Sequence, residues 1–256
     1  MITASFELRR ATSVEEAVRL LGEAGGDVKL LAGGQSLIPL MKLRLAAPAV
    51  LVDLGRVEGL SYVREDGGHI AIGALTRHAD VAASDAVPRA LAEAASEVGD
   101  QQVRNRGTIG GSVAHADPNA DLPAVLLALG GELVMVGPGG ERTVPAREFF
   151  QGYLTTALAA DEVLTEVRIP SAEKSAYVKF NRRAQDWALV GCAAVANGSE
   201  VVAWTGVGSG PVLAEGDWRE AAGRLEPASD LAGSADYKRH LAGVLAERAL
   251  AQARAG

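Results

Sequence analysis

Cysteine is nearly absent from this chain, whose 256 residues include a single one, Cys192. One thiol forms no internal disulfide, and it falls short of the several thiolates that an iron–sulfur cluster or a structural zinc site usually needs. His115, Asp117 and Asp121 are close in sequence but lack a third nitrogen or sulfur ligand. We therefore expect no metal site here, and any metal centre that works with this chain must lie on another chain.

The sequence also lacks a basic block, a long apolar run and a signal segment. Its 25 lysines and arginines are outnumbered by 32 aspartates and glutamates, and the net charge of −7 disfavours nucleic acid as a partner. No uninterrupted apolar run reaches about 18 residues, so we expect no membrane span. The first residues show no basic segment followed by an apolar one, and we expect a cytoplasmic location.

Hydrophobic residues make up 48% of the chain, which is enough for a packed core and excludes a disordered protein. The periodicity predicts an α+β organisation. Helices are expected from the capping residue Ser13 to residue 25 and over residues 37–44, 88–99, 121–128, 218–224 and 236–253. Strands are expected over residues 29–32, 51–54, 61–64, 69–73, 132–136, 163–169, 189–196 and 200–206, the last two joined by a type I′ turn at Asn197-Gly198. The segment 101–107 is expected to be a surface loop or part of a site.

Two glycine-rich segments stand out, LLAGGQSL at residues 30–37 and TIGGSVAHADP at residues 108–118. In each, an apolar run meets a Gly-Gly pair and then a serine, so backbone N–H groups can converge on a phosphate without obstruction by a Cβ atom. Either pair alone is more typical of a simple turn. Neither segment is a Walker loop or a Rossmann fingerprint, and the glycines of residues 206–210 fail that spacing and indicate a loop. Together, the two segments predict one dinucleotide held from two sides.

These segments carry a family resemblance. KLLAGGQSL at residues 29–37, TIGGS at residues 108–112, Asp117-Pro118 and the run DLP from Asp121 resemble the FAD-binding medium subunit of molybdenum hydroxylases, of which carbon monoxide dehydrogenase and xanthine dehydrogenase are the best-known relatives. The likeness spans nearly the whole chain and continues through KFNRRAQDWALV at residues 179–190.

The resemblance implies a two-subdomain FAD-binding fold of the vanillyl-alcohol oxidase type, followed by a small α+β domain with helices and a three-stranded antiparallel sheet. Our own division fits this layout, with residues 1–56 as FAD-binding subdomain 1, residues 57–170 as subdomain 2 and residues 171–256 as the C-terminal domain. The resemblance also implies FAD on this chain, and molybdopterin and [2Fe–2S] clusters on a large and a small partner subunit.

The resemblance implies, position by position, two sets of residues that contact the flavin cofactor. The first and second glycine segments would supply Lys29, Leu31, Ala32, Gly33, Gly34, Gln35, Ser36 and Leu37, and Thr108, Gly111, Ser112 and Ala114. Other parts of the chain would supply Ala74, Thr76, Asp121, Leu164, Lys179, Asp186 and Trp187. None of them is expected to be a catalytic acid, base or nucleophile, because the cofactor carries the chemistry.

Several of these residues have simpler explanations. Lys29 can be a surface lysine, Asp121 the N-cap of the helix over residues 121–128, and Trp187 a core residue. Ser112 departs from the asparagine usual in relatives, and the chain is slightly short around residues 210–230. The branch of the family with a cysteine-bearing cluster insertion is excluded, since the chain has no cysteines to supply it.

The implied function is that of an electron exit. FAD on this chain would take electrons from the [2Fe–2S] clusters of a partner and pass them to an external acceptor, which the sequence leaves open among NAD, a quinone and oxygen. One alternative is a free-standing FAD-dependent oxidoreductase with its own substrate pocket, but no cluster of His, Tyr or Arg marks such a pocket. The other is a scaffold without cofactor, which the intact glycine segments disfavour.

Overall fold

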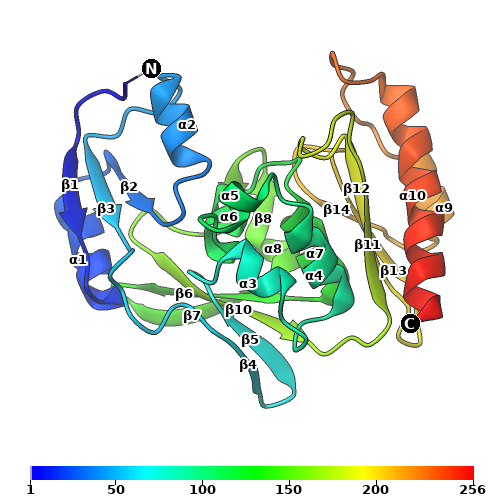
Figure 1. The fold of residues 1–256 in the computed structure, drawn as a ribbon, viewed down its shortest axis with the longest axis horizontal. Helices are drawn as coiled ribbons and strands as arrows, with labels where there is room; N and C mark the ends of the chain where they lie inside the picture. The colour runs from blue at the N-terminus through cyan, green and yellow to red at the C-terminus, as the bar shows by residue number, and fades with distance from the viewer. Residues whose placement is uncertain (1) are drawn as a thin grey trace.

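The computed structural model describes residues 2–256, and its elements form an N-terminal lobe, a central body and a C-terminal lobe in that order across the molecule (Figure 1). The N-terminal lobe is a three-stranded parallel sheet in the order β1-β3-β2. Its strands and helices are β1 (Glu7–Arg10), α1 (Val14–Glu23), β2 (Val28–Leu31), α2 (Leu37–Lys42) and β3 (Val50–Asp53). Ser13 caps α1 as predicted, accepting a hydrogen bond from the Glu16 backbone N–H at 3.2 Å.

The central body is built on a five-stranded antiparallel sheet in the order β4-β5-β10-β6-β7. The strands are β4 (Val63–Asp66), β5 (His69–Gly73), β6 (Glu132–Gly137), β7 (Gly140–Pro145) and β10 (Val163–Pro170), and a small hairpin of β8 (Phe150–Gly152) and β9 (Thr155–Thr156) lies beside them. The helices are α3 (His78–Ala82), α4 (Arg89–Ser96), α5 (Gln101–Arg104), α6 (Ile109–His115), α7 (Asp121–Leu129) and α8 (Ala146–Phe149). The hairpin predicted between residues 61 and 73 is confirmed as β4–β5.

The C-terminal lobe is a four-stranded antiparallel sheet in the order β11-β12-β13-β14, where three strands were expected. Its elements are β11 (Ser175–Phe180), β12 (Val190–Val195), β13 (Val201–Thr205), β14 (Val212–Leu213), α9 (Trp218–Gly223) and α10 (Ala235–Ala255). The fourth strand arises because the chain turns back after the glycines of residues 206–210 and pairs two residues with β13. The predicted hairpin at Asn197-Gly198 exists, but Gly198 alone has a positive φ there, so the turn is not type I′.

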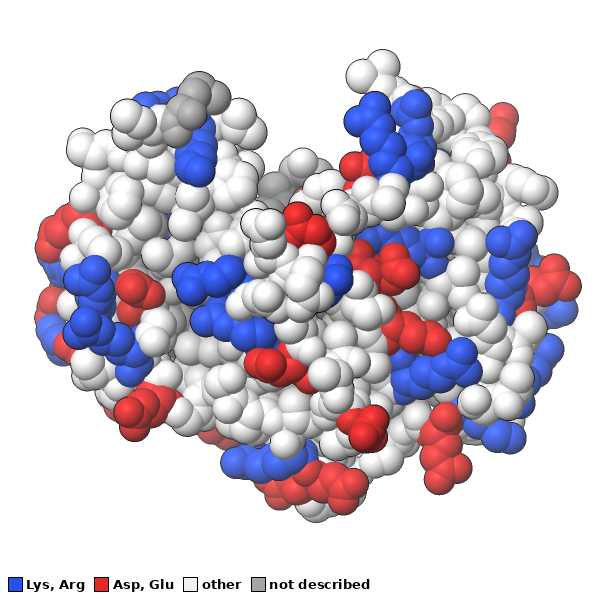
Figure 2. All heavy atoms as spheres, in the orientation of Figure 1, with Lys and Arg blue, Asp and Glu red and all other residues white. Residues whose placement is uncertain are grey.

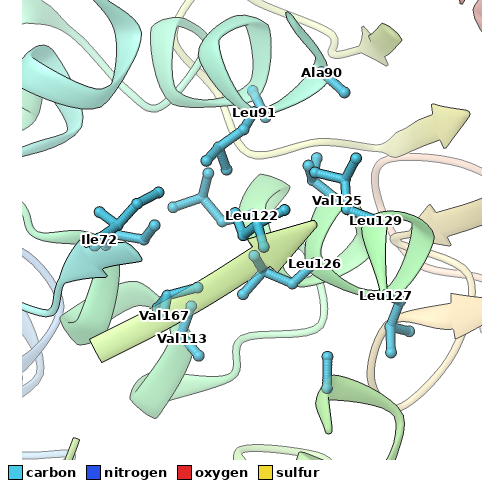
Figure 3. Close-up of a cluster of buried hydrophobic side chains, with 14 of the residues drawn as sticks. Ile72, Ala90, Leu91, Val113, Leu122, Val125, Leu126, Leu127, Leu129 and Val167 are labelled. Atoms are coloured by element: carbon cyan, nitrogen blue, oxygen red, sulfur yellow. The ribbon is translucent and has the colours of Figure 1, made fainter. Parts of the chain in front are cut away.

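The helix α7 explains how the central body and the C-terminal lobe pack together. All of its residues are buried. Leu122 and Leu126 belong to the same hydrophobic cluster as Ile72, Leu91 and Val167 of the central core (Figure 3), and the helix also lies against β12 and β13. The C-terminal sheet is thus covered by α4 and α7 on one face and by α10 on the other, and every residue of β12 is buried. A helix buried all round carries no amphipathic stripe.

One local prediction was wrong, and a second was wrong in part. Asp121 is not an N-cap; Ala120 occupies that position, and Asp121 is the first helical residue with its side chain turned to other partners. In the segment 101–107, expected to be a surface loop or part of a site, residues 101–104 are not a loop but the short helix α5, because Asp100 caps it by accepting from the Val103 N–H at 2.8 Å. The second Gly-Gly pair lies inside a helix, α6.

The division of the chain at residues 56 and 170 stays a prediction, although the buried residues fall into three hydrophobic clusters that follow the lobes closely. Four residues of the C-terminal sheet, Tyr177, Ala193, Val195 and Ala203, belong to the central cluster. Among the described residues, no helix combines the length and the apolar character that crossing a bilayer requires.

Candidate functional site

The two glycine segments meet in space. A Cβ atom on Gly33 would lie 2.7 Å from the Gly107 Cα and closer still to the Arg106 carbonyl oxygen, so the first segment touches the backbone that leads into the second. A Cβ atom on Gly111 would lie 3.8 Å from the Ala32 Cβ. We call this junction, formed by residues 32–36 and 106–112, the glycine seam. It lies between the N-terminal lobe and α5–α6, where the surface is hollowed (Figures 1 and 2).

The first side of the seam is the turn between β2 and α2. Gly34 has a φ of +73°, a left-handed conformation that glycine adopts without strain. Ser36 precedes α2 without making a side-chain capping bond, so no helical N–H occupies its hydroxyl. The predicted residues of this side are all at least partly exposed: Leu31, Ala32, Gly33, Gly34, Gln35, Ser36 and Leu37.

The second side of the seam is the start of α6. Thr108 caps this helix, its hydroxyl accepting from the Gly111 N–H at 3.1 Å, which leaves Gly111, Ser112 and Ala114 on partly exposed turns. The helix ends at Ala116, whose φ of +49° is unusual for a residue with a side chain. The segment is therefore held at both ends by specific local conformations.

Ala74, Thr76 and Leu164 support the second side from the central sheet. The Ala74 and Thr76 carbonyls accept hydrogen bonds from the Gly110 and Ile109 N–H groups at 2.9 and 3.0 Å. The Ala74 N–H in turn donates to the Thr165 carbonyl at 2.9 Å, which places the neighbouring Leu164 close behind the seam, 6% exposed. The structure thus brings these three predicted residues to the glycine seam.

Lys29, at the exposed edge of β2, faces the far end of α6. Burial lowers the pKa of His115, the negative charge of Asp117 opposes that shift, and the positive charge of Lys29 adds to it. Lys29 therefore lies within electrostatic reach of the second segment, across the seam from its own lobe. None of the described residues forms a group of three or more His, Cys, Asp or Glu side chains placed to hold a metal ion.

Asp121 and Lys179 form an ion pair with each other. The Asp121 carboxylate accepts from the Tyr177 hydroxyl at 2.6 Å and from the Lys179 ammonium at 3.2 Å, and Lys179 also donates to the Glu97 carbonyl at 3.0 Å. The side chains of Asp121 and Lys179 are 4% and 2% exposed. Burial raises the pKa of Asp121 because desolvation outweighs the attraction of Lys179. This cluster joins α7 and α4 to the C-terminal sheet.

Asp186 and Trp187 lie apart from the glycine seam and from the Asp121–Lys179 pair. They are exposed in the loop between β11 and β12, where Gln185 has a φ of +71° and the Trp187 side chain is 57% exposed. The alternative that Trp187 is a core residue is therefore wrong. The loop belongs to the rim of the C-terminal lobe beside the hollow, where Figure 2 shows basic side chains. An exposed indole at such a rim is free to cover a planar ligand.

Two residues beside the seam, Arg77 and His78, were missed by the sequence analysis, and Arg106 was named only as part of the segment 101–107. The Arg77 guanidinium donates to the Arg106 carbonyl, and the His78 N–H donates to the Gly107 carbonyl at 3.1 Å. Their signal in the sequence is weak, because isolated basic residues near a glycine pair are common. Tyr177 was also missed, although it stands two residues before Lys179 on the same face of a strand.

His78 supports the seam as a neutral side chain. It is 3% exposed, its Nδ1 has no hydrogen-bond partner among the described residues, and a Cβ atom on Gly107 would lie 2.7 Å from its ring. Burial, followed by the positive charges of Arg104 and Arg77, lowers the pKa of His78 from 6.5 to about 4. Protonation would place a third charge beside those two arginines.

We expect this histidine to make the protein acid-sensitive. Because its pKa is lower in the folded state, its contribution to stability is complete above pH 6.5 and is lost as the pH falls toward about 4. The loss should reach roughly 2–3 kcal/mol by pH 4.5. Urea unfolding across this range, compared between the native protein and His78→Gln, measures it. Equal pH dependence in both proteins would contradict the assignment.

The comparisons with known proteins agree on one family. The family model described as "FAD binding domain in molybdopterin dehydrogenase" matches residues 4–172. The carbon monoxide dehydrogenase medium chain of Hydrogenophaga pseudoflava is 43% identical over 279 residues, covering 98% of this chain and 97% of the relative. The 6-hydroxypseudooxynicotine dehydrogenase complex subunit alpha of Paenarthrobacter nicotinovorans is 43% identical over 197 residues, covering 75% of this chain and 67% of that subunit. A solved structure of the Hydrogenophaga pseudoflava carbon monoxide dehydrogenase superposes with a TM-score of 0.95 at 44% identity, covering 100% and 99% of the two chains.

Proposed function

This chain belongs to the family of FAD-binding domains of molybdopterin dehydrogenases, and from that premise we propose how its residues serve as the flavin subunit of a molybdenum hydroxylase complex. The observation that carries the proposal is the glycine seam, where two segments far apart in the sequence come together beside a hollow of the surface. We also propose that the N-terminal lobe and the central body are the two subdomains of a vanillyl-alcohol oxidase type fold, with boundaries near residues 56 and 170.

The residues present at the seam fit an FAD diphosphate. Gly33 and Gly107 let the two segments pack backbone to backbone, the Ser36 hydroxyl makes no capping bond, and the Arg77 guanidinium donates to the Arg106 carbonyl at the point where the segments touch. In this proposal residues 32–37 and residues 108–114 bind the dinucleotide from opposite sides through backbone N–H groups and small side chains. Ala74 and Thr76 fix the second side, and Lys29 contributes a positive charge.

The isoalloxazine is assigned to the hollow between the lobes. Leu164 supports it from the central sheet, and Asp186 and Trp187 approach it from the C-terminal rim, where the exposed indole shields one face from water. When bound, FAD supplies the chemistry of two-electron oxidoreduction with one-electron partners. Asp121 and Lys179 contribute indirectly in our proposal, because their charges are already satisfied at the junction of the central body and the C-terminal lobe.

We propose that the electrons come from [2Fe–2S] clusters on a small partner subunit, which in turn receives them from a molybdopterin-binding large subunit. They leave through an external acceptor, for which NAD, a quinone and oxygen all stay open. The solved Hydrogenophaga pseudoflava structure is described as the carbon monoxide dehydrogenase in a form that lacks the Mo-pyranopterin moiety of the molybdenum cofactor. The alternative of a free-standing FAD oxidoreductase differs in requiring no partner chains. A cytoplasmic location stays a prediction.

Two measurements test the proposal. The purified chain should be yellow and carry about one FAD, or should bind FAD when it is added, with quenching of the exposed Trp187 as the optical signal; Trp204 and Trp218 are buried. A colourless chain that cannot be reconstituted would overturn the FAD assignment.

Affinity purification from the native host should retrieve a molybdopterin-binding chain and an iron–sulfur chain, and retrieval of neither would favour the free-standing oxidoreductase.

A further inference from the structure

Arg77 occupies a central position at the glycine seam. It lies between Thr76 and the helix α3, and its guanidinium donates a hydrogen bond to the Arg106 carbonyl oxygen. The same carbonyl oxygen is the atom closest to the position that a Cβ atom on Gly33 would take. Arg77 also pairs with Thr108, the cap of α6, in an isolated β-bridge. One guanidinium therefore reaches the point at which both glycine segments touch.

The positive charges at this point are not compensated by carboxylates. Within the described chain neither Arg77 nor Arg106 makes an ion pair, whereas Arg142 and Arg168 each pair with a buried or nearly buried glutamate. Burial and the charge of Arg106 both lower the pKa of Arg77, and the opposing effect of Asp80 is the smallest of the three. Arg104 also lies on this side, donating to the Val98 and Gly99 carbonyls. Arg77 is thus partly buried and Arg106 exposed, and their guanidiniums are close enough to repel each other.

We propose that Arg77 and Arg106 are the charged half of an anion site at the glycine seam, and that its ligand is the diphosphate of FAD. This inference rests on the proposed function, which it deepens by naming side chains where the seam itself offers backbone groups. A guanidinium suits this task because its planar N–H groups match phosphate oxygens and it keeps its charge when partly buried. A bound dianion would also relieve the repulsion between the two arginines.

A purely structural role for Arg77 gives a different expectation. If its hydrogen bond to the Arg106 carbonyl only holds the two segments together, any ligand of the seam should be weakened alike when Arg77 is replaced. If Arg77 binds the diphosphate, the loss should be confined to ligands that carry phosphate. FAD and riboflavin share the isoalloxazine and differ in the phosphates and the adenosine, so the two flavins separate these roles.

The experiment uses the full-length chain freed of flavin, and it measures the Kd of FAD and of riboflavin for the native protein, Arg77→Gln, Arg77→Lys and Arg248→Gln. Arg77→Gln should weaken FAD by roughly ten- to a hundred-fold, the effect of losing a charged hydrogen bond, and leave riboflavin within about two-fold. Arg77→Lys should recover part of the FAD affinity. Arg248 is the matched control, since it is exposed on α10 and makes no ion pair in the described chain.

The outcomes separate this inference from the proposed function. If the native protein binds no FAD, the proposed function itself fails. If the native protein binds FAD and Arg77→Gln binds it equally well, the site is wrong and the function stands. Equal weakening of FAD and riboflavin by Arg77→Gln would make Arg77 a structural residue of the seam and would also overturn the inference.

Discussion

Replacement of Gly33 by alanine is expected to weaken FAD binding by at least a hundred-fold, about 3 kcal/mol of binding free energy. The reason is steric, because the new Cβ atom would lie 2.7 Å from the Gly107 Cα and closer to the Arg106 carbonyl. Both neighbours are backbone atoms, which cannot rotate away as a side chain does. The two sides of the seam would have to separate, and the N–H groups that converge from them would no longer meet at one ligand.

The measurement is an FAD titration of the flavin-free protein, with Gly22→Ala as the control. Gly22 lies in α1, and a Cβ atom there would meet nothing within 4 Å, so the change should leave FAD affinity unaltered. Circular dichroism of Gly33→Ala should still report the native content of helix and strand, since the substitution disturbs a junction and no core. Native FAD affinity in Gly33→Ala would exclude the seam as the binding site.

The two glycines of the first segment illustrate how far the sequence could predict this site. Both suggest close approach to a ligand, and the sequence does not distinguish them. In the structure Gly34 needs its glycine for the φ of +73°, and a Cβ atom there would meet mainly the movable end of Ile38 at 2.8 Å. Gly33 needs its glycine because another part of the backbone lies against it, and such a long-range contact has no local signature.

The prediction of secondary structure from the sequence has the same limit, because it finds elements with a local pattern and misses those without one. The strands β5 and β10 were predictable because their apolar residues and turn signals are local. The strand β14 pairs two residues with β13 after a glycine turn, and two residues are too few to show a period. The short helix α5 was missed because its cap, Asp100, begins a polar segment with no apolar face. Tertiary pairing decides the first case, and a local capping hydrogen bond decides the second.

Asp121 and Lys179 were predicted as flavin residues from the family pattern, and the structure supplies a second reason for charged residues at these positions. Both are buried where the C-terminal sheet meets the central body, and Thr205 strengthens the same junction by contacting the Pro118 and Ala120 carbonyls at 2.7 and 2.8 Å. A motif that recurs in a family does not by itself distinguish a residue that binds the ligand from one that joins two lobes behind it.

Replacement of Lys179 by methionine is therefore expected to reduce the free energy of unfolding by about 3–5 kcal/mol, the typical cost of leaving one partner of a buried ion pair alone. Methionine fills a similar volume, so the loss reports the charge and its hydrogen bonds more than a cavity. It strands the Asp121 carboxylate at 4% exposure and leaves the Glu97 carbonyl without its donor. Urea unfolding of the flavin-free protein measures the change.

Lys238→Met is the matched control, because Lys238 is 7% exposed and pairs at 2.5 Å with Asp230, which is 52% exposed and keeps its hydration when the lysine is lost. This control should cost about 1 kcal/mol or less. Adding Asp121→Asn to Lys179→Met should recover part of the loss, since it removes the stranded charge and keeps an acceptor for the Tyr177 hydroxyl. If Lys179→Met instead leaves unfolding unchanged and weakens FAD binding alone, Lys179 contacts the flavin directly and the junction does not depend on it.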